Sequence, residues 1–181
     1  MKREQSNSSR YNLRSGLILY PSQQEAIEKL LTDLIQQTPA HFLLLADVTG
    51  QVVSTRGEQA QKNLVGLGSL VAGDLAASHE IARLTGQYEA YQMVLREGQS
   101  THTFICEAGH YLALMVQVST ETPLGWARMT IGKAARRLTE IADTPPAEQE
   151  RIEIPPEDLE PLKQDGLSNL FNDALDDLWL E

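Results

Sequence analysis

The sequence predicts an α+β domain whose elements follow the order helix, two strands, helix, three strands, helix. Two observations predict it. Three segments carry apolar residues at helical spacing. Between them, five short apolar or β-branched runs are separated by short turns, which is typical of antiparallel hairpins. The chain has 181 residues, enough for one domain with terminal extensions.

The first helix is expected over residues 22–37. Ser22 and Glu25 have the spacing of a capping box, in which each side chain satisfies a free backbone N–H. Pro39 forces the preceding residue out of helical geometry and ends the helix. Residues 1–21 are expected to form a mobile arm, with or without one extra strand. The apolar face of the helix comprises Ile27, Leu30, Leu31, Leu34 and Ile35.

A hairpin follows the first helix, with strands at 42–47 and 51–55. The first strand is apolar along most of its length, so we expect it to be buried on both faces and central in its sheet. Asp47 and Gly50 have the DxxG spacing of a GTPase switch, but the sequence contains no companion nucleotide-binding motif. Because Asp and Gly suit hairpin connections, we interpret this motif as a turn.

The second helix is expected from about residue 59 to Leu84 and is apolar nearly all round. Such a helix is buried on more than one side. It contains Gly66, Gly68 and Gly73, and each helical glycine costs roughly 1 kcal/mol relative to alanine. Close approach of another helix would explain these glycines.

Three strands are then expected at 91–95, 101–107 and 110–118, with a two-residue turn at 108–109 between the last two. The third helix begins with proline at its first position, Pro123. Its apolar stripe comprises Leu124, Ala127, Ile131, Ala134, Leu138 and Ile141.

The main domain is therefore expected over 22–143, followed by a semi-extended linker. Residues 144–166 contain five of the eight prolines. Residues 167–181 then repeat apolar residues at helical spacing opposite an acidic face, which predicts a helix that docks in a hydrophobic groove. The alternative is an acidic tail that only aids solubility. The docking stripe comprises Leu167, Leu170, Phe171, Leu175, Leu178 and Trp179.

Charge is unevenly distributed along the chain. Residues 1–139 carry 13 basic and 12 acidic side chains, whereas residues 140–181 carry 2 basic and 13 acidic ones. Such a distribution disfavours nucleic acid as a partner, because phosphates would be repelled. Apolar runs far shorter than the ~20 residues that span a bilayer exclude membrane insertion. The N-terminus has no apolar secretory signal, so a cytoplasmic location is expected.

The sequence lacks a persuasive catalytic constellation. Glu107 and His110 are expected to pair across a turn as a structural contact. Cys106 lies on an expected strand and is interpreted as a small buried hydrophobe. We therefore expect no enzymatic activity, no cofactor and no metal site. An enzyme with an unrecognised site is the third alternative for the function.

The chain resembles the Roadblock/dynein-light-chain family, and within it the bacterial MglB-like regulators of Ras-like GTPases. The capped first helix, the hairpin 43–53, the Gly/Ala-rich helix 64–84, the strand 112–118 and the helix 123–141 carry this resemblance. It implies a five-stranded antiparallel sheet, with the second helix on one face and the first and third helices on the other.

The resemblance also implies a homodimer in which the second helices pair and the edge strands join. The alternative is a helix buried within a larger monomer, although no remaining segment covers it well. The expected dimer contacts are Leu64, Leu67, Gly68, Val71, Ala72, Leu75, Tyr91, Met93 and Leu95.

The function implied by the resemblance is that of a non-enzymatic regulator of a small Ras-like GTPase, as an activating or polarity-setting partner. The alternative is a scaffold that links proteins through its dimer platform and acidic C-terminal helix, without an effect on GTP turnover. The side chains expected to contact the GTPase are equally consistent with a solvated helix face. They are Arg56, Lys62, Val65, Ser69 and His79.

Overall fold

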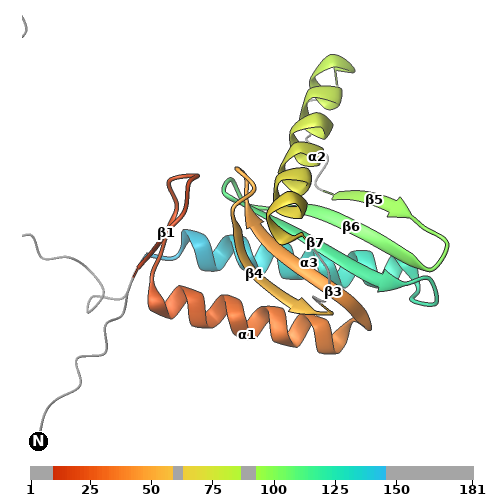
Figure 1. Cartoon of the computed structure of the whole chain (residues 1–181), viewed down its shortest axis with the longest axis horizontal. Coiled ribbons are helices and arrows are strands. Elements are labelled where there is room, and N and C mark those ends of the chain that lie inside the picture. Colours follow the sequence, from red (N-terminus) through yellow and green to blue (C-terminus); the bar gives the residue numbers. More distant parts are fainter. Residues whose placement is uncertain (1–9, 59–62, 87–92, 146–181) are drawn as a thin grey trace, which may run out of the picture. The chain divides into compact units, whose positions relative to one another are not determined.

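The computed structural model describes residues 10–58, 63–86 and 93–145 (Figure 1). The linker from residue 146 onward and the docking helix at 167–181 lie outside the described residues, as do Lys62 and Tyr91.

A five-stranded antiparallel sheet forms the middle layer, in the order β4-β3-β7-β6-β5 (Figure 1). Its strands are β3 (Ala40–Asp47), β4 (Val52–Gly57), β5 (Met93–Glu97), β6 (Thr101–Ala108) and β7 (Leu112–Ser119). The helices are α1 (Pro21–Gln37), α2 (Leu64–Leu84) and α3 (Leu124–Asp143). This order confirms the predicted fold class.

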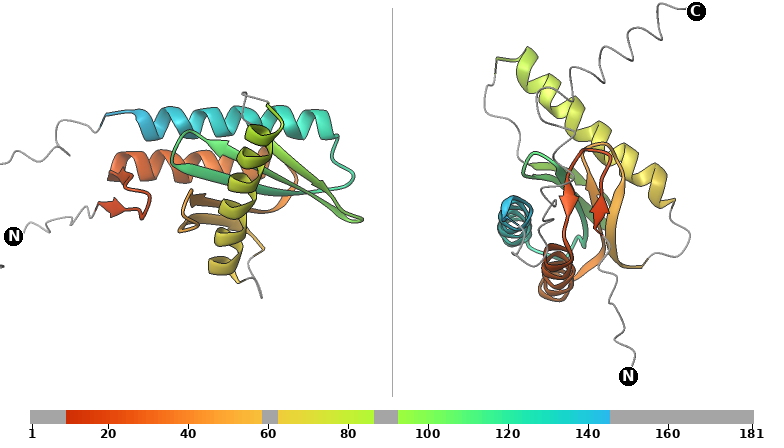
Figure 2. Two further views of the ribbon diagram at one scale, coloured as in Figure 1. Left: turned by 90° about the horizontal axis from the view of Figure 1, so that it is seen from above. Right: turned by 90° about the vertical axis from the view of Figure 1, so that its left-hand side faces the viewer.

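The helices cover opposite faces of the sheet. α1 and α3 lie side by side on one face and α2 crosses the other, as the two views of Figure 2 show. Because side chains alternate along a strand, Leu43 and Leu45 of β3 pack on the α1/α3 side. Phe42 and Leu44 pack on the α2 side. The apolar run of β3 is thus buried on both faces, as predicted, although β7 takes the middle position in the sheet.

The start of α1 differs from the prediction. The helix begins at Pro21, and the N–H of Tyr20 donates to Oε1 of Gln23 at 3.0 Å. The predicted box between Ser22 and Glu25 is therefore wrong, because the N-cap is Tyr20, two residues before Ser22, and Gln23 takes the acceptor role. Gln23 is buried, and its Nε2 donates to carbonyls at the end of α3, including that of Ile141 at 2.9 Å.

Residues 10–20 of the expected N-terminal arm contain two short strands, where the sequence suggested at most one. This segment forms a small antiparallel hairpin of β1 (Tyr11–Asn12) and β2 (Ile18–Leu19). Leu13 and Leu19 are buried in the core on the α1/α3 side. Two apolar side chains in a short polar segment thus suffice to attach the hairpin to the domain.

The connection between β6 and β7 is one residue longer than predicted. Ala108 pairs with Leu112, so residues 109–111 form the turn. Gly109 has φ +73°, a conformation that side chains with a Cβ rarely adopt. The longer turn shifts the register, and Glu107 lies opposite Ala113 instead of pairing with His110 as predicted.

Candidate functional site: the outer face of α2

The inner face of α2 packs on the sheet. Val71 and Leu75 are buried against Phe42, Leu44 and neighbouring sheet residues. Leu64 and Leu67 are partly buried against the same cluster. Val71 and Leu75, which we expected in a dimer surface, are therefore covered by the chain's own sheet, whereas Leu64 and Leu67 keep part of their surface exposed. A helix that is apolar nearly all round does not reveal from its sequence which side faces its own sheet.

The packing reason for Gly68 also differs from the prediction. A Cβ on Gly68 would lie 2.4 Å from the carbonyl oxygen of Gly50 in the turn between β3 and β4. A Cβ on Gly50 would in turn lie 2.7 Å from Cα of Ser69. Gly68 thus allows α2 to approach the turn of its own sheet, and not another helix.

The opposite side of α2 carries apolar residues with no described partner. Leu70 is 72% exposed and Leu84 is 70% exposed, and Ile81 is also exposed. A Cβ on Gly73 would meet nothing within 4 Å. The members of this row are spaced three or four residues apart, which places them on one side of the helix. We call it the outer seam, and it comprises Leu70, Gly73, Ala77, Ile81 and Leu84.

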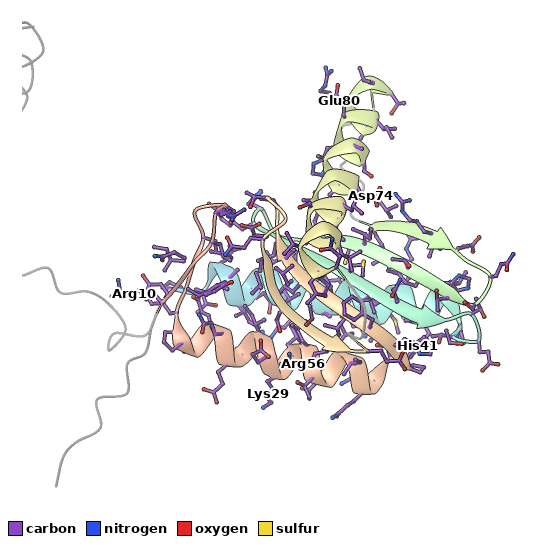
Figure 3. All side chains as sticks on the ribbon, viewed as in Figure 1. Arg10, Lys29, His41, Arg56, Asp74 and Glu80 are labelled. Atoms are coloured by element: carbon purple, nitrogen blue, oxygen red, sulfur yellow. The ribbon has the colours of Figure 1, made fainter. Side chains whose placement is uncertain are left out.

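The outer seam has the pattern of a helix that packs against a second helix. Its members are separated by three, four, four and three residues, and such spacings keep contact residues on the side of a helix that meets a second helix. A monomer seldom leaves several large apolar side chains exposed in one row. Gly73 adds room for close approach at the middle of the row. The C-terminal half of α2 extends past the sheet, where Glu80 is labelled in Figure 3.

Two ion pairs connect α2 to the sheet. Asp74 pairs with Arg96 of β5, and Nε2 of His79 lies against the carboxylate of Glu107 on β6. His79, which we expected to contact a GTPase, therefore already has a partner within the domain. Its position on α2 could be inferred from sequence, whereas its contact with Glu107 depends on the register of β6 and β7.

Arg56 does not lie with the α2 residues of the expected GTPase surface. It pairs with Glu28 of α1, and its Nη1 donates to the carbonyl of Thr55 at 2.7 Å. Figure 3 shows Arg56 beside α1, on the opposite side of the sheet from α2. The structure therefore separates Arg56 from Val65 and Ser69, both of which are exposed on α2.

The two edge strands of the sheet differ. On β4, the carbonyl of Val52 accepts a hydrogen bond from the hydroxyl of Tyr11 at 3.4 Å, and that of Thr55 accepts one from Arg56. Among the described residues, no side chain hydrogen-bonds to the backbone of β5. β5 also exposes Leu95, while Met93 packs toward the core on the α1/α3 side. Within the described part of the chain, β5 is thus the edge strand whose backbone no side chain occupies.

The described residues include no group of three or more His, Cys, Asp or Glu side chains placed to hold a metal ion. Cys106 is fully buried, and burial together with the nearby charge of Glu107 raises the pKa of its thiol to about 12. A thiol with that pKa is a poor nucleophile at neutral pH. None of the described helices is long and apolar enough to cross a membrane.

Asp47 stabilises the turn between β3 and β4. Burial opposes ionisation of the Asp47 carboxyl group and by itself raises its pKa. Hydrogen bonds outweigh this effect, so the pKa is lowered. The donors are the hydroxyl of Thr49 and the backbone N–H groups of Gln51, Ser15 and Thr49. The DxxG motif is therefore a turn, as the sequence predicted. The bond from Ser15 also attaches the N-terminal hairpin to this turn.

Comparisons with known proteins give matches only at the level of structure. No protein-family model matches the chain, and neither does any curated protein. The structure is similar to that of Myxococcus xanthus MglB, with 29% sequence identity, a TM-score of 0.61, and coverage of 64% of this chain and 94% of that one. A second MglB structure, described as having a tetrameric arrangement, is 28% identical with a TM-score of 0.64, covering 70% and 95% of the two chains.

The chain has a Roadblock-like fold of the MglB type. A Roadblock/LC7 domain from Streptomyces avermitilis shares the same fold, with 20% identity and a TM-score of 0.58 over 64% of this chain and 97% of that one. The matched part of this chain covers nearly the whole length of both MglB structures.

Proposed function

We propose that this MglB-type chain is a homodimeric, non-enzymatic regulator of a small Ras-like GTPase. The observation that carries the proposal is the outer seam of α2, an exposed apolar row beside the open edge strand β5 in a chain similar to MglB. The tetrameric arrangement of one MglB structure supports self-association of this chain.

In the proposed dimer, the outer seams of two copies pack together, with Gly73 near the crossing point. Burying one exposed leucine side chain stabilises a complex by about 1.5–3 kcal/mol. Each copy contributes Leu70, Ile81 and Leu84 to this contact. Burial of these side chains offsets part of the entropy that the two copies lose when they associate. The β5 strands then extend the sheet between copies through Leu95 and its neighbours.

The GTPase would bind beside the seam, at Val65 and Ser69. Val65 is 76% exposed, and Ser69 lies one helical turn further on the same side of α2. We propose that the chain acts by contact, ordering catalytic groups that the GTPase itself supplies. The buried Cys106, whose thiol pKa is raised to about 12, is consistent with this role. Ala72 and His79 flank this surface, and Lys62 is proposed as part of it.

The direct experiment is GTP hydrolysis by the small Ras-like GTPase encoded nearest this gene, measured with and without the full chain. A changed hydrolysis rate supports the proposal. Val65→Glu combined with Ser69→Glu should abolish the effect while the dimer mass stays unchanged. Lys29→Glu, on the exposed side of α1, is the matched charge control and should leave the effect intact. An absence of binding in both nucleotide states would rule out the regulator function.

A scaffold without effect on GTP turnover is the second candidate, and the charge distribution favours it specifically. Residues 140–181 carry a net charge of −11, from 2 basic and 13 acidic side chains. We propose that 144–166 serve as a linker and 167–181 as a helix that docks on another protein. Deleting 167–181 should then weaken partner binding and leave the dimer intact.

A further inference from the structure

A pocket of about 450 Å³ lies at the N-terminal end of α3. The helix α3 itself lies beside α1, on the opposite side of the sheet from α2 (Figure 2). Two prolines and a tryptophan form its apolar walls, and three polar residues complete it. Its lining residues are Pro39, Ser119, Glu121, Thr122, Pro123 and Trp126. Neither the fold nor the outer seam of α2 accounts for this pocket.

Two neighbouring groups favour a cation in the pocket. Trp126 is 39% exposed, although tryptophan is usually covered in a folded domain. Glu121 is exposed, and among the described residues its carboxylate forms no ion pair. No lysine or arginine lines the pocket. An indole face and an uncompensated carboxylate in the same pocket together attract a guanidinium or ammonium group.

Hydrogen-bonding groups at the same place favour a peptide over a free cation. Thr122 is 5% exposed, and its Oγ1 has no hydrogen-bond partner in the described part of the chain. The N–H groups in the first turn of α3 have no acceptor within the helix, where the first such bond runs from Ala127 to the carbonyl of Pro123. A peptide carbonyl satisfies such N–H groups, whereas an isolated cation does not.

We propose that this pocket binds an extended peptide segment of a partner protein through one arginine or lysine side chain. The guanidinium or ammonium group lies over the indole of Trp126 and pairs with Glu121. The peptide backbone places a carbonyl at the N-terminus of α3, and Pro39 and Pro123 contact its apolar atoms. An acidic peptide is disfavoured, because Glu121 repels it.

The pocket is independent of the proposed dimer. α2 lies on the other face of the sheet, so a peptide at Trp126 and a second copy at the outer seam do not compete for the same surface. This site therefore gives the chain a second way to recruit a protein, whether or not the chain acts on a GTPase.

The test uses acetyl-Ala-Arg-Ala-amide as the probe and the full chain as the receptor. The indole N–H resonance of Trp126 is followed by NMR, and a Trp126→Phe variant distinguishes it from that of Trp179. We expect a saturable shift with a dissociation constant of about 1 mM. The matched peptide with citrulline, which has the shape of arginine without its charge, should bind at least about fivefold more weakly.

Glu121→Gln should weaken binding of the arginine peptide about fivefold and leave binding of the citrulline peptide unchanged, since only the charge is removed. Met129→Ala, on the exposed side of α3 one turn further, is the control and should bind both peptides like the wild type. Equal binding of the two peptides, no effect of Glu121→Gln, or no shift of the Trp126 resonance at about 20 mM peptide would each overturn the proposal.

Discussion

Gly68 of α2 and Gly50 of the β3–β4 turn bring their backbones into direct contact, because a Cβ on Gly68 would lie 2.4 Å from the carbonyl oxygen of Gly50. Gly50 has φ +89°, so neither residue tolerates a side chain without movement of the backbone. This contact sets the distance between α2 and the sheet, and with it the position of the outer seam.

Gly68→Ala is therefore expected to destabilise the protein by about 1–3 kcal/mol, as overpacking does, despite the better helix propensity of alanine. Denaturant unfolding followed by circular dichroism measures the change. Gly125→Ala is the matched control, because a Cβ at this helical glycine would meet nothing within 4 Å. If both variants are as stable as the wild type, the close contact does not exist in solution.

The turn that contacts Gly68 is also the origin of an expected pH dependence. The pKa of Asp47 is lowered from 3.8 in the native state, so its ionised form contributes stability above about pH 4 that is lost as the pH falls through the native pKa. Asp47→Asn should cost about 1–3 kcal/mol at pH 7, since several N–H and O–H donors lose a charged acceptor. Urea unfolding should show that the difference from wild type shrinks at pH 3. A difference that is independent of pH would contradict this role of Asp47.

Cys106 is expected to be inert in the native protein. Burial raises the pKa of its thiol to about 12, so very little thiolate exists at pH 8 and reagents cannot reach the sulfur. A thiol-reactive chromogenic disulfide should therefore react only at the rate at which the protein opens, and rapidly in denaturant. Fast labelling of the native chain at pH 8 would show that β6 is more accessible than the structure indicates.

The sequence could predict most of the fold, because the elements follow from local periodicity. The stripe of α3 from Ala127 to Leu138 and the doubly buried run of β3 are set by apolar spacing alone. The register of β6 and β7 could not be predicted in this way, because a turn of two residues and one of three both accommodate Gly109. The longer turn places Ala113 and not His110 opposite Glu107, whose side chain pairs with His79 instead.

The candidate site was predicted less completely than the fold. The glycine-rich apolar pattern predicted that the site lies on α2. It could not predict which face of α2 forms the site, because apolar residues occur on all sides of this helix. Only tertiary contacts distinguish Val71, buried against the sheet, from Leu70, which is exposed. Tertiary contacts also distinguish Gly68 from Gly73. A Cβ on Gly68 would meet the carbonyl oxygen of Gly50, whereas a Cβ on Gly73 would meet nothing within 4 Å.

The mass of the protein in solution tests most directly whether the outer seam of α2 binds a second copy of the chain. Multi-angle light scattering at micromolar concentration should give about 40 kDa for the wild type, twice the 20.1 kDa of one chain. Gly73→Arg should reduce the mass to that of one chain without unfolding it, because a side chain there points into open space. Gln36→Arg on α1 is the control and should leave the dimer intact. A wild-type mass near 20 kDa, or a dimer that persists in Gly73→Arg, would contradict the account.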